Sequence, residues 1–284
     1  MKIAYVTDTG TGKTPQYFEE KGIFCIPLQI AVDNVNYQDI VEMSTEQCIE
    51  NMRNKKVMTT SLPSLGKIVE LFEKLKNEGY EHIIAVPICS GLSGTISAMH
   101  NAASQVGLPI TTIDTYVTAV VEEYLIEMIK ESIEKGRSEE VIQKAVDEVI
   151  ESCHTYIIPD DLQHLKRGGR LTPLAATLAG LLKIKPILLI DKSTNGKIDA
   201  LEKVRTSKKA FDRIFEIFHT LSPNSNTSIT FAHVDDEETA KELMNRAAQE
   251  FPEANLQIIP LINTVSVHTG LKCQAFQIFN KAEF

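Results

Sequence analysis

No two cysteines of this 284-residue chain are spaced as CxxC, and their total of five is odd. Structural zinc sites need closely paired cysteine ligands, and a disulfide framework needs an even set. The histidines have no metal-ligand spacing either. We therefore expect no metal site and no metal cofactor, but free, buried thiols in a reducing compartment, at positions Cys25, Cys48, Cys89, Cys153 and Cys273.

Long hydrophobic runs are also missing. The longest apolar stretch, around residues 174–182, is much shorter than the roughly 20 residues of a membrane-spanning helix. Residues 1–8 lack the apolar core of a signal peptide and are typical of a first β-strand. These features predict a cytoplasmic protein.

The chain has fewer basic than acidic residues. The chain has 29 Lys and Arg against 38 Asp and Glu, a formal net charge of −9. Nucleic acids and anionic membranes are bound mainly by basic surfaces. We therefore expect no nucleic-acid partner, although a transient membrane contact is compatible with a local basic pocket. With 43% hydrophobic residues, the chain can still form a sizeable core.

The first part of the chain alternates strand-like and helix-like segments. Repeated β-α units of this kind predict a parallel sheet with helices on both faces. The expected strands are 3–6, 23–28, 83–88 and 110–113, and the expected helices are 64–76, 96–105, 122–134 and 139–152.

After residue 153 the pattern changes to α+β. An antiparallel or mixed sheet is expected there, so the sequence predicts an N-terminal α/β lobe, residues 1–155, and a C-terminal α+β lobe, residues 156–284. In the second lobe the expected strands are 155–158, 187–190, 198–204, 229–233, 256–260 and 274–279, and the expected helices are 208–221 and 237–250.

Three polar motifs are suited to one small anion: TTSLP at 59–63, SGLSGT at 90–95 and RGGR at 167–170. The middle motif follows an apolar strand and precedes a predicted helix. Such a turn presents hydroxyls, unpaired backbone N–H groups and the positive end of the helix, a combination that suits a phosphate or a carboxylate.

Each motif also has a purely structural interpretation. Thr60 and Ser61 precede Pro63, so they can cap a helix, and Ser93 can cap the next one. Arg170 can be an ordinary surface residue. The basic cluster that begins at Arg205 can be a solvated helix face.

Two enzyme-like motifs are incomplete. Residues 9–14 resemble a nucleotide P-loop but lack its first glycine, and Pro15 is expected to disturb the helix start. Residues 91–95 miss the GxSxG nucleophile elbow by one position, although Asp114 and His268 follow Ser93 in the order of such hydrolases. A serine hydrolase or acyltransferase using Ser93 and His268 is therefore the alternative. A phosphate-sugar or kinase-like domain is a third.

The segment 171–190 is rich in Leu and Ile, with the small residues Ala175, Ala176, Ala179 and Gly180 between them. A packed core is the simplest interpretation, but small residues also leave room for an aliphatic chain. Each buried methylene contributes about 0.8 kcal/mol, so a long tail can be held without covalent chemistry.

The sequence resembles the DegV family of bacterial fatty-acid-binding proteins over nearly its whole length. The matching motifs, in family order, are residues 60–63, 90–95, 162–170, 185–188, 205–210 and 268–270. The chain departs from the family pattern in the loop at 8–10 and at Leu62, Cys89 and Leu271, where the family usually has Gln, Ser and Pro.

The resemblance implies a two-lobed α/β fold with one fatty acid between the lobes. It also implies a non-catalytic carrier that presents the fatty-acid carboxylate to a separate ATP-binding fatty acid kinase subunit, which makes an acyl-phosphate for phospholipid synthesis. The carboxylate-binding residues it implies are Thr60 or Ser61, Ser93, Gly94 and His268, and the supporting or kinase-facing residues are Arg170 and Arg205.

Overall fold

The computed structural model describes residues 1–178 and 184–284. The chain forms two compact units: residues 1–142 with 262–264, and residues 143–261 with 265–284. The lobes expected from the sequence, 1–155 and 156–284, differ from this division in residues 143–155 and 262–264. Ala179 and Gly180, from the expected apolar segment, lie outside the described residues.

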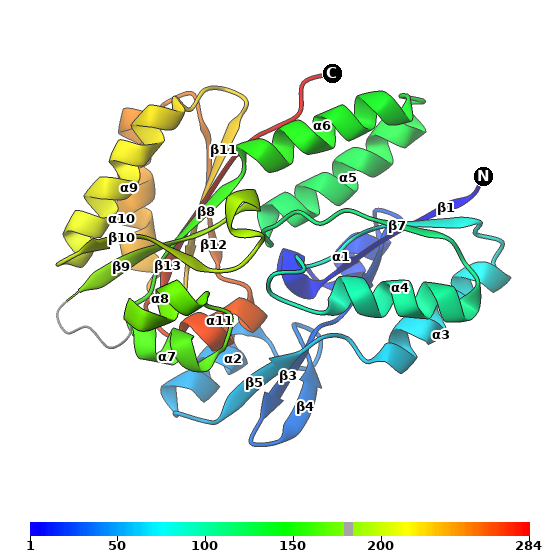
Figure 1. The fold of residues 1–284 in the computed structure, drawn as a ribbon, viewed down its shortest axis with the longest axis horizontal. Coiled ribbons are helices and arrows are strands. Elements are labelled where there is room, and N and C mark those ends of the chain that lie inside the picture. The colour runs from blue at the N-terminus through cyan, green and yellow to red at the C-terminus, as the bar shows by residue number, and fades with distance from the viewer. Residues whose placement is uncertain (179–183) are drawn as a thin grey trace. The chain divides into compact units, whose positions relative to one another are not determined.

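The first unit contains a parallel four-stranded sheet of order β2-β1-β6-β7 (Figure 1). Side chains alternate between the two faces of its strands, because successive residues of a strand point in opposite directions. Ala4 and Val6 of β1 belong to the core cluster on one face, whereas Thr7 contacts helix α5 on the other. The strands are β1 (Ile3–Asp8), β2 (Phe24–Ile26), β6 (His82–Val86) and β7 (Ile110–Thr112).

Helices cover both faces of this sheet, as the sequence predicts. On one face α3 (Leu65–Asn77) and α4 (Thr95–Val106) lie side by side and bury apolar residues of both helices against β1 and β6. On the other face α5 (Val120–Glu134) contacts β1 and β6. Helix α6 (Glu139–Ser152) has the bounds that the sequence predicts and crosses from the first unit to the second.

A second, antiparallel sheet of order β4-β3-β5 was not predicted. Its strands are β3 (Gln29–Val32), β4 (Val35–Gln38) and β5 (Met58–Ser61). Asp33 and Asn34 join β3 to β4 with φ values of 48° and 70°. A two-residue turn with positive φ at both positions is typical of a tight hairpin, and Asp and Asn tolerate this conformation. The Asp-Asn pair between alternating residues was therefore a usable hairpin signal.

The second unit is built on a six-stranded sheet of order β10-β9-β8-β13-β11-β12 (Figure 1). Only the β11–β12 pair is parallel among these neighbours, so the expected mixed sheet is confirmed. The strands are β8 (His154–Ile158), β9 (Lys185–Ile190), β10 (Asp199–Val204), β11 (Thr227–His233), β12 (Asn255–Pro260) and β13 (Gln274–Asn280).

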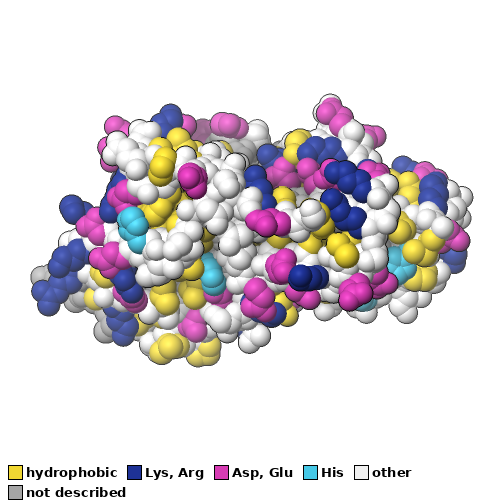
Figure 2. Space-filling model, turned by 90° about the horizontal axis from the view of Figure 1, so that it is seen from above, with side chains coloured by type: hydrophobic (Ala, Val, Ile, Leu, Met, Phe, Trp, Pro, Cys, Tyr) yellow, Lys and Arg dark blue, Asp and Glu magenta, His cyan; other side chains and the backbone are white. Residues whose placement is uncertain are grey.

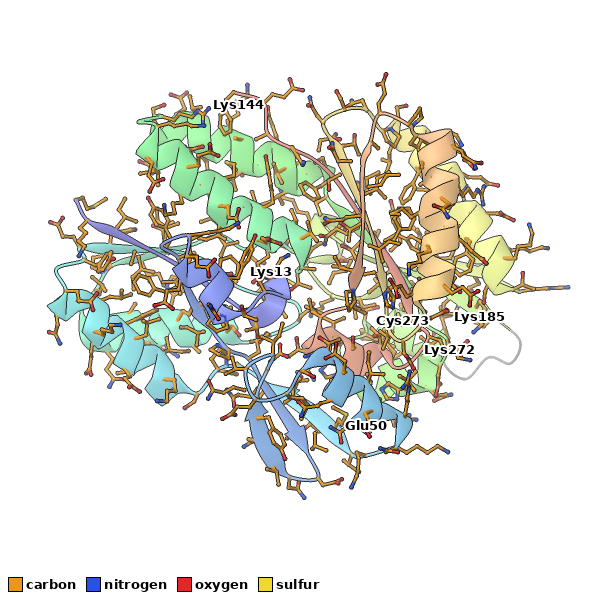
Figure 3. The ribbon with its side chains drawn as sticks, turned by 180° about the vertical axis from the view of Figure 1, so that it is seen from behind. Lys13, Glu50, Lys144, Lys185, Lys272 and Cys273 are labelled. Atoms are coloured by element: carbon orange, nitrogen blue, oxygen red, sulfur yellow. The ribbon has the colours of Figure 1, made fainter. Side chains whose placement is uncertain are left out.

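Helices α9 (Ser207–Leu221) and α10 (Glu237–Glu250) close one face of the six-stranded sheet over an aromatic core. Phe218 of α9 lies against Phe276 of β13 with ring centroids 6.5 Å apart. Lys272 and Cys273 directly precede the first residue of the same strand (Figure 3), and burial raises the pKa of the Cys273 thiol to about 12.

Several short elements escaped the sequence pattern because they are too brief to show a period. Pro15 is the first residue of α1, with Thr14 as its cap, so the expectation that it disturbs a helix start is wrong. The additional elements are α1 (Pro15–Glu19), α2 (Thr45–Arg53), α7 (Leu162–Arg167), α8 (Pro173–Leu178), α11 (Asn263–Thr269), and the 3-10 turns η1 (Thr9–Thr11) and η2 (Lys192–Thr194).

Within residues 1–178 and 184–284, no helix combines the length and the apolar composition needed to cross a membrane. On the face shown in Figure 2, basic and acidic side chains lie interspersed over most of the surface. The described residues also form exposed ion pairs, such as Lys56–Asp33, 2.7 Å between Nζ and Oδ2.

Candidate functional site

Thr60 and Ser61 lie in strand β5, where they pair with Ile30 and Gln29 of β3. The cap of helix α3 is Ser64, which makes no side-chain capping bond. The helix-cap interpretation of Thr60 and Ser61 is therefore wrong. Both hydroxyl side chains belong to the last residues of a strand, where the chain leaves the small sheet for α3.

The turn at 90–95 connects β6 to α4. Its Ser93 side chain is hydrogen-bonded to Thr95, with 2.8 Å between the two hydroxyl oxygens. Gly94, rather than Ser93, is the N-cap of α4 and supplies no side-chain cap. The first N–H groups of a helix have no intrahelical partner, so this end of α4 offers backbone donors beside the Ser93 hydroxyl.

The first two motifs meet within the first unit. A Cβ added to Gly94 would lie 3.6 Å from Cδ2 of Leu62, which is an ordinary contact distance. Leu62 is 37% exposed and follows Thr60 and Ser61 directly. The structure thus brings the ends of the 59–63 and 90–95 motifs together, with an aliphatic side chain between them.

Two carboxylates anchor the backbone at the start of the turn. The Ile88 N–H donates to Oδ2 of Asp8 at 3.0 Å, and the Ser90 N–H donates to Oδ1 of Asp114 at 3.3 Å. The same Asp114 oxygen also accepts the N–H of Tyr116 at 3.1 Å. Asp114 therefore holds backbone N–H groups of the first unit, which is a structural role rather than the orientation of a catalytic histidine.

In the second unit the third motif is interlocked with the 268–270 segment. A Cβ on Gly168 would lie 2.5 Å from Nδ1 of His268, and a Cβ on Gly270 would lie 3.1 Å from Cδ2 of His164. Nε2 of His164 is 2.8 Å from the Val267 carbonyl oxygen. Because a carbonyl only accepts, this nitrogen carries the proton. Each histidine thus packs on a glycine of the other segment, His164 on Gly270 and His268 on Gly168.

His268 is neutral at physiological pH. Burial, together with the charges of Arg170 and His164, lowers the pKa of its imidazole to about 4. Arg170 itself is fixed by a bond from its guanidinium Nη1 to the Gly168 carbonyl, 2.7 Å long. A neutral imidazole can donate one hydrogen bond to a carboxylate. The positive charge nearby is then that of the arginine guanidinium.

Arg205 is exposed and follows β10 directly. The next residue, Thr206, caps α9 by accepting the Lys209 N–H at 3.2 Å. The structure therefore places Arg205 beside the cap of α9. Its role in a binding site stays a prediction.

Four of the predicted residues, Thr60, Ser61, Ser93 and Gly94, belong to the first unit, and His268 belongs with Arg170 to the second. Sequence reasoning missed the contacts of His164 and Leu62, and it missed a buried carboxyl pair beneath the 90–95 turn. Among the described residues, no group of three or more His, Cys, Asp or Glu could hold a metal ion.

Known proteins resemble this chain over its whole length. The sequence profile described as "Uncharacterised protein, DegV family" matches residues 2–281. A DegV domain-containing protein of Halalkalibacterium halodurans is 32% identical over 272 residues, covering 95% of each chain. The solved structure of DegV from Bacillus subtilis, described as a fatty acid binding protein, has a TM-score of 0.85 at 30% identity and covers 99% of this chain and 100% of its own. A fatty acid binding DegV family protein from Streptococcus agalactiae has a TM-score of 0.88 at 29% identity, covering 99% of each chain.

Proposed function

This chain belongs to the DegV family, and from that premise we propose that it binds one long-chain fatty acid without catalysing its turnover. In this proposal the carboxylate is held by Ser93, the backbone at Gly94 and a hydroxyl of Thr60 or Ser61. His268 is proposed as a further residue that binds this carboxylate. Arg170 and Arg205 support the acid group or face a partner protein.

The observation that carries the proposal is the juxtaposition of the first two motifs. Ser93 and the uncapped first turn of α4 present donors at one place, and Leu62 brings the end of β5 to the same place. Hydroxyls and helix N-terminal N–H groups stabilise a carboxylate. Two solved relatives, 30% and 29% identical to this chain, are both described as fatty acid binding proteins.

We propose further that the bound carboxylate is presented to a separate ATP-dependent fatty acid kinase, which converts it to an acyl-phosphate. In this proposal the partner binds the ATP, which agrees with the incomplete P-loop at residues 9–14 of this chain. A cytoplasmic location and transient contact with a membrane, the source and destination of acyl chains, belong to the same proposal.

Native mass spectrometry of the gently purified protein tests the first step. We expect an adduct of a few hundred daltons that is a fatty acid. Protein that stays unliganded after incubation with C14–C18 acids would contradict the proposal. For the second step, acyl-phosphate should form only when a fatty acid kinase and ATP are both added to the loaded protein.

The hydrolase alternative has less support from the geometry. Asp114 holds the N–H groups of Ser90 and Tyr116, and the lowered pKa of His268 makes it a weak general base. A fluorophosphonate probe separates the two functions. Labelling that disappears in Ser93→Ala would favour the hydrolase, whereas an unlabelled protein that still carries lipid favours the carrier.

A further inference from the structure

Two carboxyl groups are buried together beneath the 90–95 turn of the first unit. Asp8 is the last residue of β1, and Glu122 lies in the first turn of α5; both are fully buried. Their carboxyl groups lie close enough to interact with each other directly. Gly10 lies against both, since a Cβ there would be 2.6 Å from Oδ1 of Asp8 and 2.8 Å from Oε2 of Glu122.

Two neutral hydroxyls, that of Thr7 on β1 and that of Thr118 just before α5, are polar neighbours of the Glu122 carboxyl group. Thr7 Oγ1 is 2.8 Å from the Val86 carbonyl oxygen and 3.2 Å from a Glu122 oxygen. Thr118 Oγ1 is 2.8 Å from the Gly10 carbonyl oxygen and 2.9 Å from the other Glu122 oxygen. Each hydroxyl has one proton, and the carbonyls can only accept. Each hydroxyl therefore shares its one proton between a carbonyl and Glu122, and neither brings a compensating positive charge to the pair.

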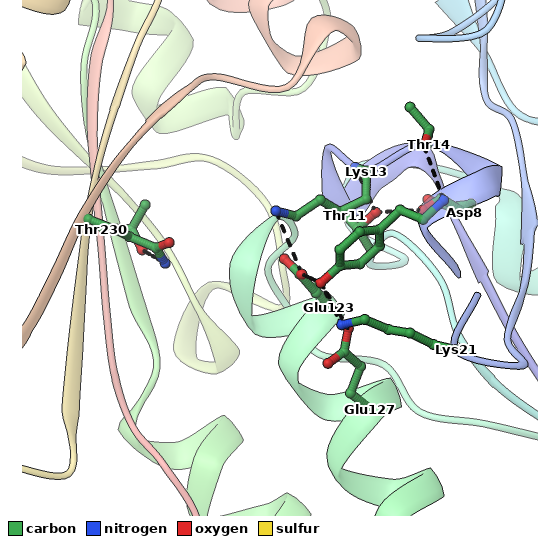
Figure 4. A network of polar contacts seen from close by, with 10 residues as sticks. Asp8, Thr11, Lys13, Thr14, Lys21, Glu123, Glu127 and Thr230 are labelled. Carbon is green, nitrogen blue, oxygen red and sulfur yellow. Dashed lines mark hydrogen bonds and ion pairs between the residues drawn. The ribbon is translucent and has the colours of Figure 1, made fainter. Parts of the chain in front are cut away.

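Asp8 is the acceptor of the pair. Its Oδ1 accepts the Gly10 N–H at 2.7 Å, and its Oδ2 accepts the Ile88 N–H at 3.0 Å. Two backbone donors favour the ionised form of a carboxyl group. The Thr11 hydroxyl also donates to the Asp8 carbonyl (Figure 4), which fixes the backbone of this residue. Ile88 is two residues before Ser90, so Asp8 sets where the turn begins.

We propose that Asp8 and Glu122 share one proton at neutral pH, held on Glu122 and donated to Asp8, and that the pair positions the turn that carries Ser93. The effect on ligand binding rests on the proposed function, because it assumes that Ser93 and Gly94 hold a fatty-acid carboxylate. The shared proton itself does not depend on that function.

The surroundings favour a proton rather than a second charge. Among the described residues, the other titratable groups that interact with the pair are Asp39 after β4, Cys25 of β2 and Cys89 just before the turn, and none of these is basic. Burial raises the pKa of Glu122, and the negative charge of Asp8 raises it further. When two carboxyl groups are buried side by side, the ionisation of one raises the free-energy cost of ionising the other.

Infrared spectroscopy tests the proton directly. We expect the carbonyl stretch of a protonated carboxylic acid at pH 7 in the wild-type protein and its loss in Glu122→Gln. The matched control is Glu127→Gln on the same helix, a carboxylate paired with Lys21 and Tyr17 (Figure 4), which should keep the band. A wild-type spectrum without the band, or a band that survives Glu122→Gln, would overturn the proposal.

Titration with a C16 fatty acid at pH 7 tests the positioning role. Glu122→Ala and Asp8→Asn should each weaken binding roughly tenfold. Glu122→Gln keeps a donor toward Asp8 and should bind more tightly than Glu122→Ala. Equal affinities for Glu122→Gln and Glu122→Ala would contradict positioning, and this comparison stands even if Asp8→Asn fails to fold. If the wild type has the infrared band but binds no fatty acid, the proposed function fails and the shared proton remains.

Discussion

His268 occupies the space in which a side chain at position 168 would have to lie, because a Cβ on Gly168 would be 2.5 Å from its Nδ1. The backbone of Gly168 is helical, with φ −65°, so conformational freedom is not the reason for glycine here. The requirement is close approach. This contact fixes the imidazole against the helix that precedes Arg170.

Gly168→Ala should therefore destabilise the protein by about 1–3 kcal/mol, since the new methyl group forces the imidazole or the backbone to move. Urea denaturation measures the loss. The control is Gly66→Ala in helix α3, where an added Cβ has its nearest neighbour at 3.8 Å and should be neutral or stabilising by up to about 1 kcal/mol. Equal stabilities of the two variants would show that His268 is not packed on Gly168.

His268 should stay neutral throughout the physiological pH range. Its pKa is lowered to about 4 in the folded protein, below the ordinary 6.5 of the unfolded chain, so the unfolded state binds the proton more readily. The contribution of this pKa difference to the free energy of unfolding is fully present above pH 6.5. It decreases by about 3 kcal/mol in all as the pH falls toward 4. An NMR titration of the histidine ring carbons should show no transition of His268 near pH 6.5; one there would refute the assignment.

Asp39 should act in the opposite direction. Burial raises its pKa to about 6, from an ordinary 3.8, although it accepts bonds from Thr9 and Asn263. The folded state then binds the proton more tightly, and stability is lost as the pH rises from about 4 through 6, by about 3 kcal/mol. Asp39→Asn should flatten this part of the curve of unfolding free energy against pH.

The control for that measurement is Asp33→Asn. Asp33 is an exposed turn residue paired with Lys56, and that hydrogen bond lowers rather than raises its pKa. Asn suits its positive φ. A slope between pH 4 and 6 that is unchanged by Asp39→Asn, or lost equally in Asp33→Asn, would contradict the role of Asp39.

Single hydroxyl deletions should identify the carboxylate ligands. A hydrogen bond to a charged group contributes about 1.5–3 kcal/mol, so Ser93→Ala should weaken fatty-acid binding by roughly 10- to 100-fold. Thr60→Val and Ser61→Ala should differ, because adjacent residues of strand β5 point to opposite faces of its sheet. Calorimetric titration of the three variants decides which one is the ligand. Unchanged affinity in all three would remove this site from the proposal.

The long periodic segments could be predicted from the sequence. Helix α10 has the bounds that its periodicity indicates, because its apolar positions alone define the buried stripe. The sequence did not predict the β3-β4 hairpin or α11. Two strands of four residues and a helix of seven residues are too short to show a hydrophobic period. Part of α11 is held by a long-range bond, from the Asn263 amide to Asp39, and no local pattern encodes such a partner.

The candidate site divides in the same way. The motif at 90–95 identified Ser93 as a polar residue before a helix, and the structure places it there. The strand position of Thr60 was hidden because Pro63 suggested a helix start. The buried carboxyl of Glu122 looked like one more acidic residue on an amphipathic helix, and only the fold shows that it faces Asp8.

The reciprocal packing of two histidines on two glycines has a consequence for how this chain can change. The ring of His164 lies where a side chain at position 270 would be, and the ring of His268 lies where a side chain at position 168 would be. The two segments, far apart in the sequence, therefore constrain each other's residues. A substitution in either segment is tolerated best when its counterpart changes too. Anyone who transplants the C-terminal segment into another protein has to carry the helix before Arg170 with it.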